Sequence, residues 1–172
     1  MKIVSFVLTG VLLPVAPFLS SGKARADDIH MAQTRFGLAD GSSNVLKING
    51  RLTTPEIDGN SGMFVEKITE ADNADYLLVT SIGGSGCPAF YSFVKVTRDS
   101  ATPTAYFGNC SDLPKRSVVP GKSVTLVFPA YRPLRSTSGG VPAESYVYSL
   151  TTNVLKKNGK PISTACKGGK CE

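Results

Sequence analysis

The residues of this chain that could do chemistry most directly are its four cysteines, and Cys87 stands in the stretch GGSGCPAFYSFVKV. A cysteine in this position could be a nucleophile, a metal ligand or one half of a disulfide. A nucleophilic cysteine needs a base or a positive partner that lowers its pKa from about 8.5. The usual base is histidine, and His30 is the only histidine of the chain. Because His30 lies near the predicted start of the exported chain, where segments are normally mobile, we do not expect thiol catalysis.

The first 26 residues predict a secretory signal peptide. An apolar run from Ile3 to Leu19 is followed by Ala24-Arg25-Ala26, the small-x-small pattern that signal peptidase cleaves. Prolines within the run argue against a membrane span. We therefore expect a periplasmic or secreted protein without a membrane span after cleavage. Its expected parts are a signal peptide over 1–26, a flexible N-terminal segment over 27–43 and a single β domain over 44–172.

An oxidising compartment favours disulfides between the cysteines. All four lie in the exported part, and an even number argues for two disulfides in any of three connectivities. We favour Cys87 with Cys110 and Cys166 with Cys171, because each pair lies close in the chain and is bracketed by turn residues. A metal site on the second pair competes with this interpretation, but zinc generally takes four ligands, and beyond His30 the remaining ligands would have to be carboxylates. We expect no metal and no cofactor.

Turn signals recur about every ten residues and separate short runs rich in β-branched and aromatic residues. Asn49-Gly50 and Asn158-Gly159 each stand between two such runs, which is the strongest short signal for a β-hairpin. Residues 69–74 could form a turn or two of helix, but no longer stretch has a helical period. The expected strands cover 45–48, 51–54, 63–68, 76–82, 89–97, 104–108, 123–128, 145–150 and 154–157. This pattern predicts an all-β protein, a single disulfide-stapled antiparallel sandwich or barrel with little helix.

The first disulfide follows from the expected strands. If runs 89–97 and 104–108 pair as a hairpin, their outer ends meet, and these ends carry Cys87 and Cys110. Adjacent strand ends supply the Cα separation of roughly 4.4–6.8 Å that a disulfide requires. Closing the loop should stabilise the fold by about 3 kcal/mol in the chain-entropy model.

Two further catalytic patterns are present in the sequence. Ser92 and Lys95 match S-x-x-K, but that signature needs a helix, and on the expected strand the two side chains point to opposite sides. Several carboxylates could converge in space and act as a general acid and base, although exposed turns account for them more simply. These carboxylates belong to Glu56, Asp58, Glu66, Glu70 and Asp72.

Basic residues form the candidate binding surface. After signal removal the chain has sixteen basic and thirteen acidic residues, a surplus too small to indicate nucleic acid. The basic residues nevertheless concentrate near the C-terminus and beside a glycine-serine loop, where they could contact an envelope protein or an anionic envelope component. The candidate residues are Tyr131, Arg132, Arg135, Lys156, Lys157, Lys160, Lys167 and Lys170.

The stretches GGSGCPAFYSF and FGNCSDL resemble a GGxxCPxxY…FGxCSD pattern of uncharacterised exported proteobacterial proteins. The resemblance covers roughly residues 45–128 and extends to the hairpin sequence LKINGR, whereas CKGGKC lies outside it. It implies no assigned activity and no catalytic or binding residue.

Together these features favour a non-catalytic, exported binding module. We expect an interaction protein of the envelope, of an inhibitor or immunity type, that occludes another molecule with a rigid, disulfide-fixed loop. The alternative is a hydrolase of cell-wall or polysaccharide material that uses converging carboxylates.

Overall fold

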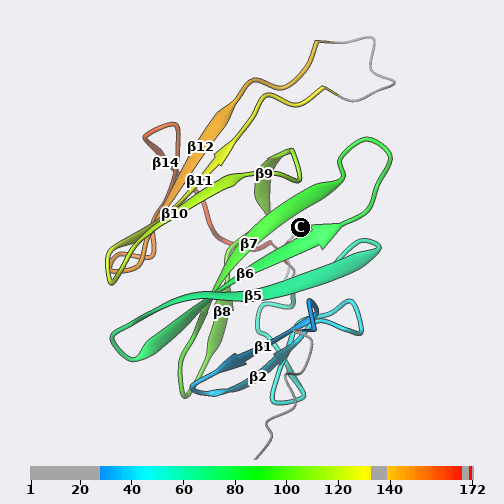
Figure 1. Ribbon diagram of the computed structural model, residues 1–172. Coiled ribbons are helices and arrows are strands. Elements are labelled where there is room, and N and C mark those ends of the chain that lie inside the picture. The colour runs from blue at the N-terminus through cyan, green and yellow to red at the C-terminus, as the bar shows by residue number, and fades with distance from the viewer. Residues whose placement is uncertain (1–27, 133–138, 168–170, 172) are drawn as a thin grey trace, which may run out of the picture.

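A computed structural model of the chain (Figure 1) describes residues 28–132, 139–167 and 171. The predicted signal peptide and its cleavage site lie outside these residues. The described part consists of strands, turns and loops and has no helix, so it contains no helix of the length and apolarity needed to cross a membrane. The all-β prediction is confirmed.

The strands form three antiparallel sheets. The N-terminal sheet consists of β1 (Met31–Thr34), β2 (Gly37–Asp40), β3 (Lys47–Ile48) and β4 (Arg51–Leu52). The central sheet consists of β5 (Gly62–Ala71), β6 (Ala74–Ile82), β7 (Ala89–Val96), β8 (Ala101–Pro103) and β9 (Phe107–Cys110). The C-terminal sheet consists of β10 (Lys115–Val119), β11 (Ser123–Phe128), β12 (Glu144–Ser149), β13 (Leu155–Lys157) and β14 (Lys160–Ile162).

The central sheet lies between the other two (Figure 1). One of its faces packs Tyr91 and Phe93 against the C-terminal sheet, where Phe93 stacks on Tyr148 with ring centroids 4.8 Å apart. The opposite face packs Leu77 and Val94 into a second core beside the N-terminal sheet. Strands covered on both faces are apolar almost throughout, which explains why β6 is buried along nearly its whole length. The protein is therefore a sandwich with a third layer added.

Both predicted hairpin turns are confirmed. Asn49 and Gly50 have φ values of 50° and 76°, and they connect β3 to β4. Asn158 and Gly159 have φ values of 48° and 81°, and they connect β13 to β14. Two consecutive residues with positive φ are what a type I′ turn needs, and asparagine and glycine tolerate that region best.

Four parts of the chain differ from expectation. β8 lies within the expected connection between runs 89–97 and 104–108 and pairs with the end of β7, so the tight turn is shorter than expected and β9 pairs separately with the start of β7. Residues 27–43 were expected to be flexible, but β1 and β2 lie there and pair with each other, and β2 also pairs with β3. Residues 69–74 do not form a helical turn, because β5 continues to Ala71 and pairs with β6 up to Ala74. β10 was not expected. It is an edge strand whose residues are mostly exposed, so its sequence shows no alternation of buried and exposed positions.

Candidate functional site

The glycine-flanked cysteine is a structural tie. Cys87 and Cys110 form a disulfide with Cα atoms 4.6 Å apart, as predicted. The register explains the proximity, because Ala89, just after Cys87, pairs directly with Cys110 across β7 and β9. Cys87 therefore has no free thiol to act as a nucleophile.

Hydrogen bonds from Asn109 and Tyr91 hold the chain on both sides of Cys110 in place. The buried side chain of Asn109 donates hydrogen bonds to the carbonyl oxygens of Pro129 and Pro142, at 2.8 and 3.1 Å. Tyr91 donates its hydroxyl hydrogen to the carbonyl oxygen of Ser111 at 3.2 Å. Burial raises the pKa of Tyr91 to about 12, so this donor keeps its proton at neutral pH. These bonds fix the backbone from which Leu113 projects, with 75% of its surface exposed.

A groove opens between the central and C-terminal sheets beside this segment. Its volume is about 610 Å³, within the range of roughly 300–1,000 Å³ typical of ligand pockets. Leu78, Tyr91 and Leu126 line it together with partly exposed residues of both sheets. Arg116 of β10 and Glu66 of β5 form a bidentate ion pair from one sheet to the other, with N–O distances of 2.5 and 2.7 Å. The groove therefore has an apolar lining and a charged clasp.

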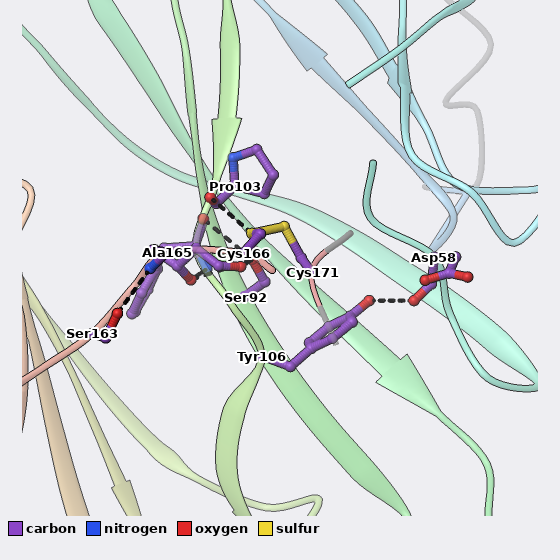
Figure 2. The surroundings of a disulfide bond; sticks show 10 residues. Asp58, Ser92, Pro103, Tyr106, Ser163, Ala165, Cys166 and Cys171 are labelled. Carbon is purple, nitrogen blue, oxygen red and sulfur yellow. Dashed lines mark hydrogen bonds between the residues drawn. A yellow bond between two sulfur atoms is a disulfide. The ribbon is translucent and has the colours of Figure 1, made fainter. Parts of the chain in front are cut away.

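The second disulfide ties the last described residues of the chain to the core beside the N-terminal sheet. Figure 2 shows Cys166 beside β8, with its Sγ 3.8 Å from the carbonyl oxygen of Pro103. Its disulfide partner Cys171 is fully buried in the core beside the N-terminal sheet, and its N–H donates to the carbonyl oxygen of Glu56. The N–H of Ala105 also donates to the carbonyl oxygen of Thr164. The last part of the chain thus connects all three layers.

This arrangement divides the predicted basic surface. Lys167 lies next to the second disulfide, whereas Lys156 and Lys160 lie on or beside the β13–β14 hairpin and are exposed. Tyr131 pairs with Val141 in an isolated bridge beyond β11, and the neighbouring Arg132 is exposed.

One predicted surface residue has a partner inside its own sheet. Lys157 forms an ion pair of 2.7 Å with the buried Glu144, which also accepts a hydrogen bond of 2.6 Å from Tyr146. The hydrogen bond that Lys157 itself donates to Glu144, together with the negative charge of that carboxylate, raises the pKa of Lys157. Two other predicted surface residues, Arg135 and Lys170, lie outside the described residues.

The side of the C-terminal sheet that faces away from the aromatic core carries no acidic residue. The register places alternate residues of β10 to β14 on the side away from the aromatic core, and none of them is buried. We call this side the outer face. It consists of Lys115, Ser117, Val119, Ser123, Thr125, Val127, Ser145, Val147, Ser149, Lys156 and Pro161.

Charge is divided between the layers. Residues 28–112, which form the N-terminal and central sheets, contain six basic and ten acidic residues, a formal charge of −4. Residues 113–172, which form the C-terminal sheet and the C-terminal segment, contain ten basic and two acidic residues, a formal charge of +8. One of these two acidic residues is Glu144, which is buried and paired with Lys157.

Two of the carboxylates that a hydrolase could use, those of Glu66 and Glu70, are paired with cations. Glu66 is paired with Arg116. Glu70 faces Asp75 across β5 and β6, but Lys67 and Arg35 form ion pairs with both of them. Burial opposes the ionisation of Asp75, yet the Arg35 backbone N–H and the Lys67 ammonium outweigh it and lower the pKa of this carboxyl. No group of three or more His, Cys, Asp or Glu residues that could hold a metal ion occurs in the part of the chain described here.

The other residues considered as catalytic candidates are Ser92, Lys95 and His30, and none of them forms a catalytic arrangement with another. Ser92 lies on β7, where its hydroxyl donates a hydrogen bond of 2.7 Å to the carbonyl oxygen of Thr104. Lys95 lies an odd number of positions along the same strand and so points to the other face, as the sequence predicted. His30 lies beside β5, with its Nδ1 2.6 Å from the carbonyl oxygen of Met63.

Comparison with protein-family models, with curated protein sequences and with solved structures finds no significant match to this chain. The sequence reasoning missed Lys115 and Ser117 because it did not anticipate β10, and it did not recognise that the hydroxyl residues of the expected strands 123–128 and 145–150 share a face with them. The signal that could have found this surface is the change in charge balance at residue 113.

Proposed function

We propose that this protein is an exported, non-catalytic binding module that contacts an anionic component of the cell envelope through the outer face of its C-terminal sheet. The outer face has no buried member, carries two lysines that are both exposed and has no acidic member. A surface of this kind attracts anionic partners over the range of a Debye length, about 8–10 Å at physiological ionic strength.

The observation that carries this proposal is the division of charge between layers. A net charge of +3 spread evenly would favour no partner, whereas +8 in residues 113–172, +7 of it within residues 113–162, and −4 in residues 28–112 give the molecule a positive side. The acidic residue that could neutralise the C-terminal sheet from within, Glu144, is buried and engaged by Lys157.

Binding accounts for the geometry better than hydrolysis does. A glycosidase needs two carboxyl groups about 5–9.5 Å apart, with one of them held protonated. Glu70 and Asp75, which pair directly across β5 and β6, are held between two cations, and the pKa of Asp75 is lowered, which is opposite to what a general acid requires.

The predicted signal peptide and the two disulfides support a periplasmic or secreted location. Intact mass spectrometry of the protein recovered outside the cytoplasm should give a chain that begins at Asp27. Its mass should rise on reduction by the amount expected for two disulfides. A chain that keeps residues 1–26 and has alkylatable thiols would contradict export.

The binding proposal is tested with envelope fragments from the producing cell. Reversing the charges of the outer face in Lys115→Glu/Lys156→Glu should release the protein from sedimented fragments. The matched control, Arg51→Glu/Arg98→Glu, makes the same change in net charge on exposed residues of the other layers and should remain bound. Equal release of both variants would contradict the proposal.

An occluding role of the inhibitor type is the second candidate. Leu113 is the most exposed of the large apolar side chains among the described residues, and its segment is tied by a disulfide and by Asn109. Pre-organised segments lose little entropy on binding. If this is the function, Leu113→Asp abolishes capture of a partner protein from periplasmic extract, whereas Leu52→Asp on the N-terminal sheet does not. Equal capture by both variants would exclude Leu113 as the contact.

A further inference from the structure

The outer face is a broad, open surface and not a pocket. β11 and β12 have six residues each, about 20 Å of extended chain, and five strands side by side span roughly 20 Å. Its residues lie in regular rows across the strands, for example Ser117, Thr125, Val147 and Lys156 in one row. A partner that uses this whole surface must itself be extended in two dimensions.

The chemistry of the face favours contact with polar, negatively charged groups. Lys115 and Lys156 stand on its first and fourth strands, and serine and threonine hydroxyls fill much of the space between them. Apolar character is limited to small side chains such as Val119 and Val127, which are 49% and 43% exposed. The face has no aromatic member, so it offers no ring on which a base could stack.

The division of charge gives the molecule a preferred orientation. The N-terminal sheet and the C-terminal sheet cover opposite faces of the central sheet, so the outer face points away from the layers with net negative charge (Figure 1). An extended anionic plane would attract the outer face and repel the opposite side. A small anion would not distinguish these orientations as strongly, because screening limits each interaction to about a Debye length.

We propose that the outer face docks the protein peripherally on an anionic lipid bilayer. This inference rests on the proposed function and assigns its partner. The lysines contact lipid phosphates, the hydroxyls contact headgroup oxygens, and the valines touch the interface without insertion. The face has none of the tryptophan or tyrosine side chains that anchor proteins at that depth. The docking is therefore electrostatic and reversed by salt.

Co-sedimentation with vesicles tests the proposal directly. The mature protein should sediment with vesicles of phosphatidylglycerol and phosphatidylcholine in equal parts at about 0.02 M NaCl, and should be released at about 0.5 M. It should not sediment with vesicles of phosphatidylcholine alone. Each lysine near an anionic bilayer contributes about fivefold to partitioning, or about 1 kcal/mol, so Lys115→Glu/Lys156→Glu should lower it by at least about 25-fold. Arg51→Glu/Arg98→Glu should change it by less than about fivefold.

A parallel measurement with dextran sulfate separates this inference from the proposed function. Sedimentation with anionic vesicles that is lost in the outer-face variant and retained in the control supports bilayer docking. Binding to dextran sulfate through the same lysines, without binding to vesicles, overturns bilayer docking and leaves an anionic polymer as the partner. Binding to neither probe overturns both. Vesicle binding that the outer-face variant retains also overturns the inference, because another surface is then responsible.

Discussion

The two outer layers of this protein pack on the same central sheet in different ways. The C-terminal sheet joins it through aromatic rings, among them Phe93 on Tyr148 and Phe128 near Tyr91. The N-terminal sheet joins it through aliphatic side chains and through Arg35, whose backbone and side chain both contact the buried Asp75. The interior of the first joint is mainly aromatic, with its only described ion pair, Arg116–Glu66, at the exposed edge, whereas the second joint includes the buried charge of Asp75.

This comparison separates the residues that packing constrains from those that it does not. Both outer layers bury their inner faces against the central sheet, so the residue types on those faces are determined by packing. The outer face of the C-terminal sheet packs on no other sheet among the described residues and carries lysine and hydroxyl residues, while the one described acidic residue of that sheet, Glu144, is turned inward. Function is therefore better inferred from the outer face than from the cores.

The largest effect should come from the aromatic joint. Phe93→Ala removes a fully buried ring between Phe107 and Tyr148, and such truncations cost about 3–5 kcal/mol. The neighbouring Val94→Ala faces the N-terminal layer and removes about two methylene equivalents, so it should cost only about 2 kcal/mol. Urea unfolding measures both. Equal losses would mean that the two joints are not energetically distinct.

The ionic joint should be nearly as sensitive. Asp75→Ala leaves Arg35 and Lys67 without their buried partner and should lower the free energy of unfolding by about 3 kcal/mol. Asp99→Ala, on an exposed turn, is the control and should stay within about 0.5 kcal/mol. A loss below about 1 kcal/mol for Asp75→Ala would show that this joint does not depend on the charge.

The same carboxyl makes stability depend on pH. Its partners lower the pKa of Asp75 below the unfolded value of about 3.9, so its contribution is fully present above that pH. The contribution is lost as pH falls through the lower pKa of the folded state. The difference in unfolding free energy between the wild type and Asp75→Ala should therefore be constant from neutral pH down to about 5 and shrink in stronger acid. A difference that grows on acidification would contradict this sign.

The disulfide that closes the longer loop should contribute more to the free energy of unfolding than the one that closes the shorter loop. Removing Cys87–Cys110, with a separation of 23 residues, should cost about 3 kcal/mol, and removing Cys166–Cys171, with a separation of 5, about 2 kcal/mol. Paired alanine variants and thermal unfolding measure this. A greater loss for the shorter loop would indicate that the anchorage of Cys171 between layers matters more than loop closure.

The smallest effect should come from the exposed clasp between layers. Arg116→Ala breaks the bidentate pair with Glu66, whose side chains are 37% and 54% exposed. Exposed pairs of this kind contribute about 0–1 kcal/mol, and salt screens them. A loss above about 2 kcal/mol in chemical denaturation would mean that the clasp holds the two sheets together.

The parts of the fold that could be predicted are those with local signals. Asn-Gly turns demand positive φ, and Cys87 and Cys110 flank strands that pair, so both were predictable. β10 and the third layer were not, since an exposed edge strand has no apolar period and β1 and β2 are short and partly polar. The sequence identified the basic residues as a candidate surface. Their placement on the β13–β14 hairpin and beside the Cys166–Cys171 disulfide depends on long-range packing that no local signal predicts.

Lysine acetylation of the protein, free and bound to anionic vesicles, tests the central claim most directly, because it reads the contacting surface in the unaltered chain. The account predicts that Lys115 and Lys156 lose reactivity on binding, while Lys47 and Lys95 of the other two layers keep theirs. Protection of Lys47 and Lys95 with Lys115 and Lys156 still reactive would contradict it.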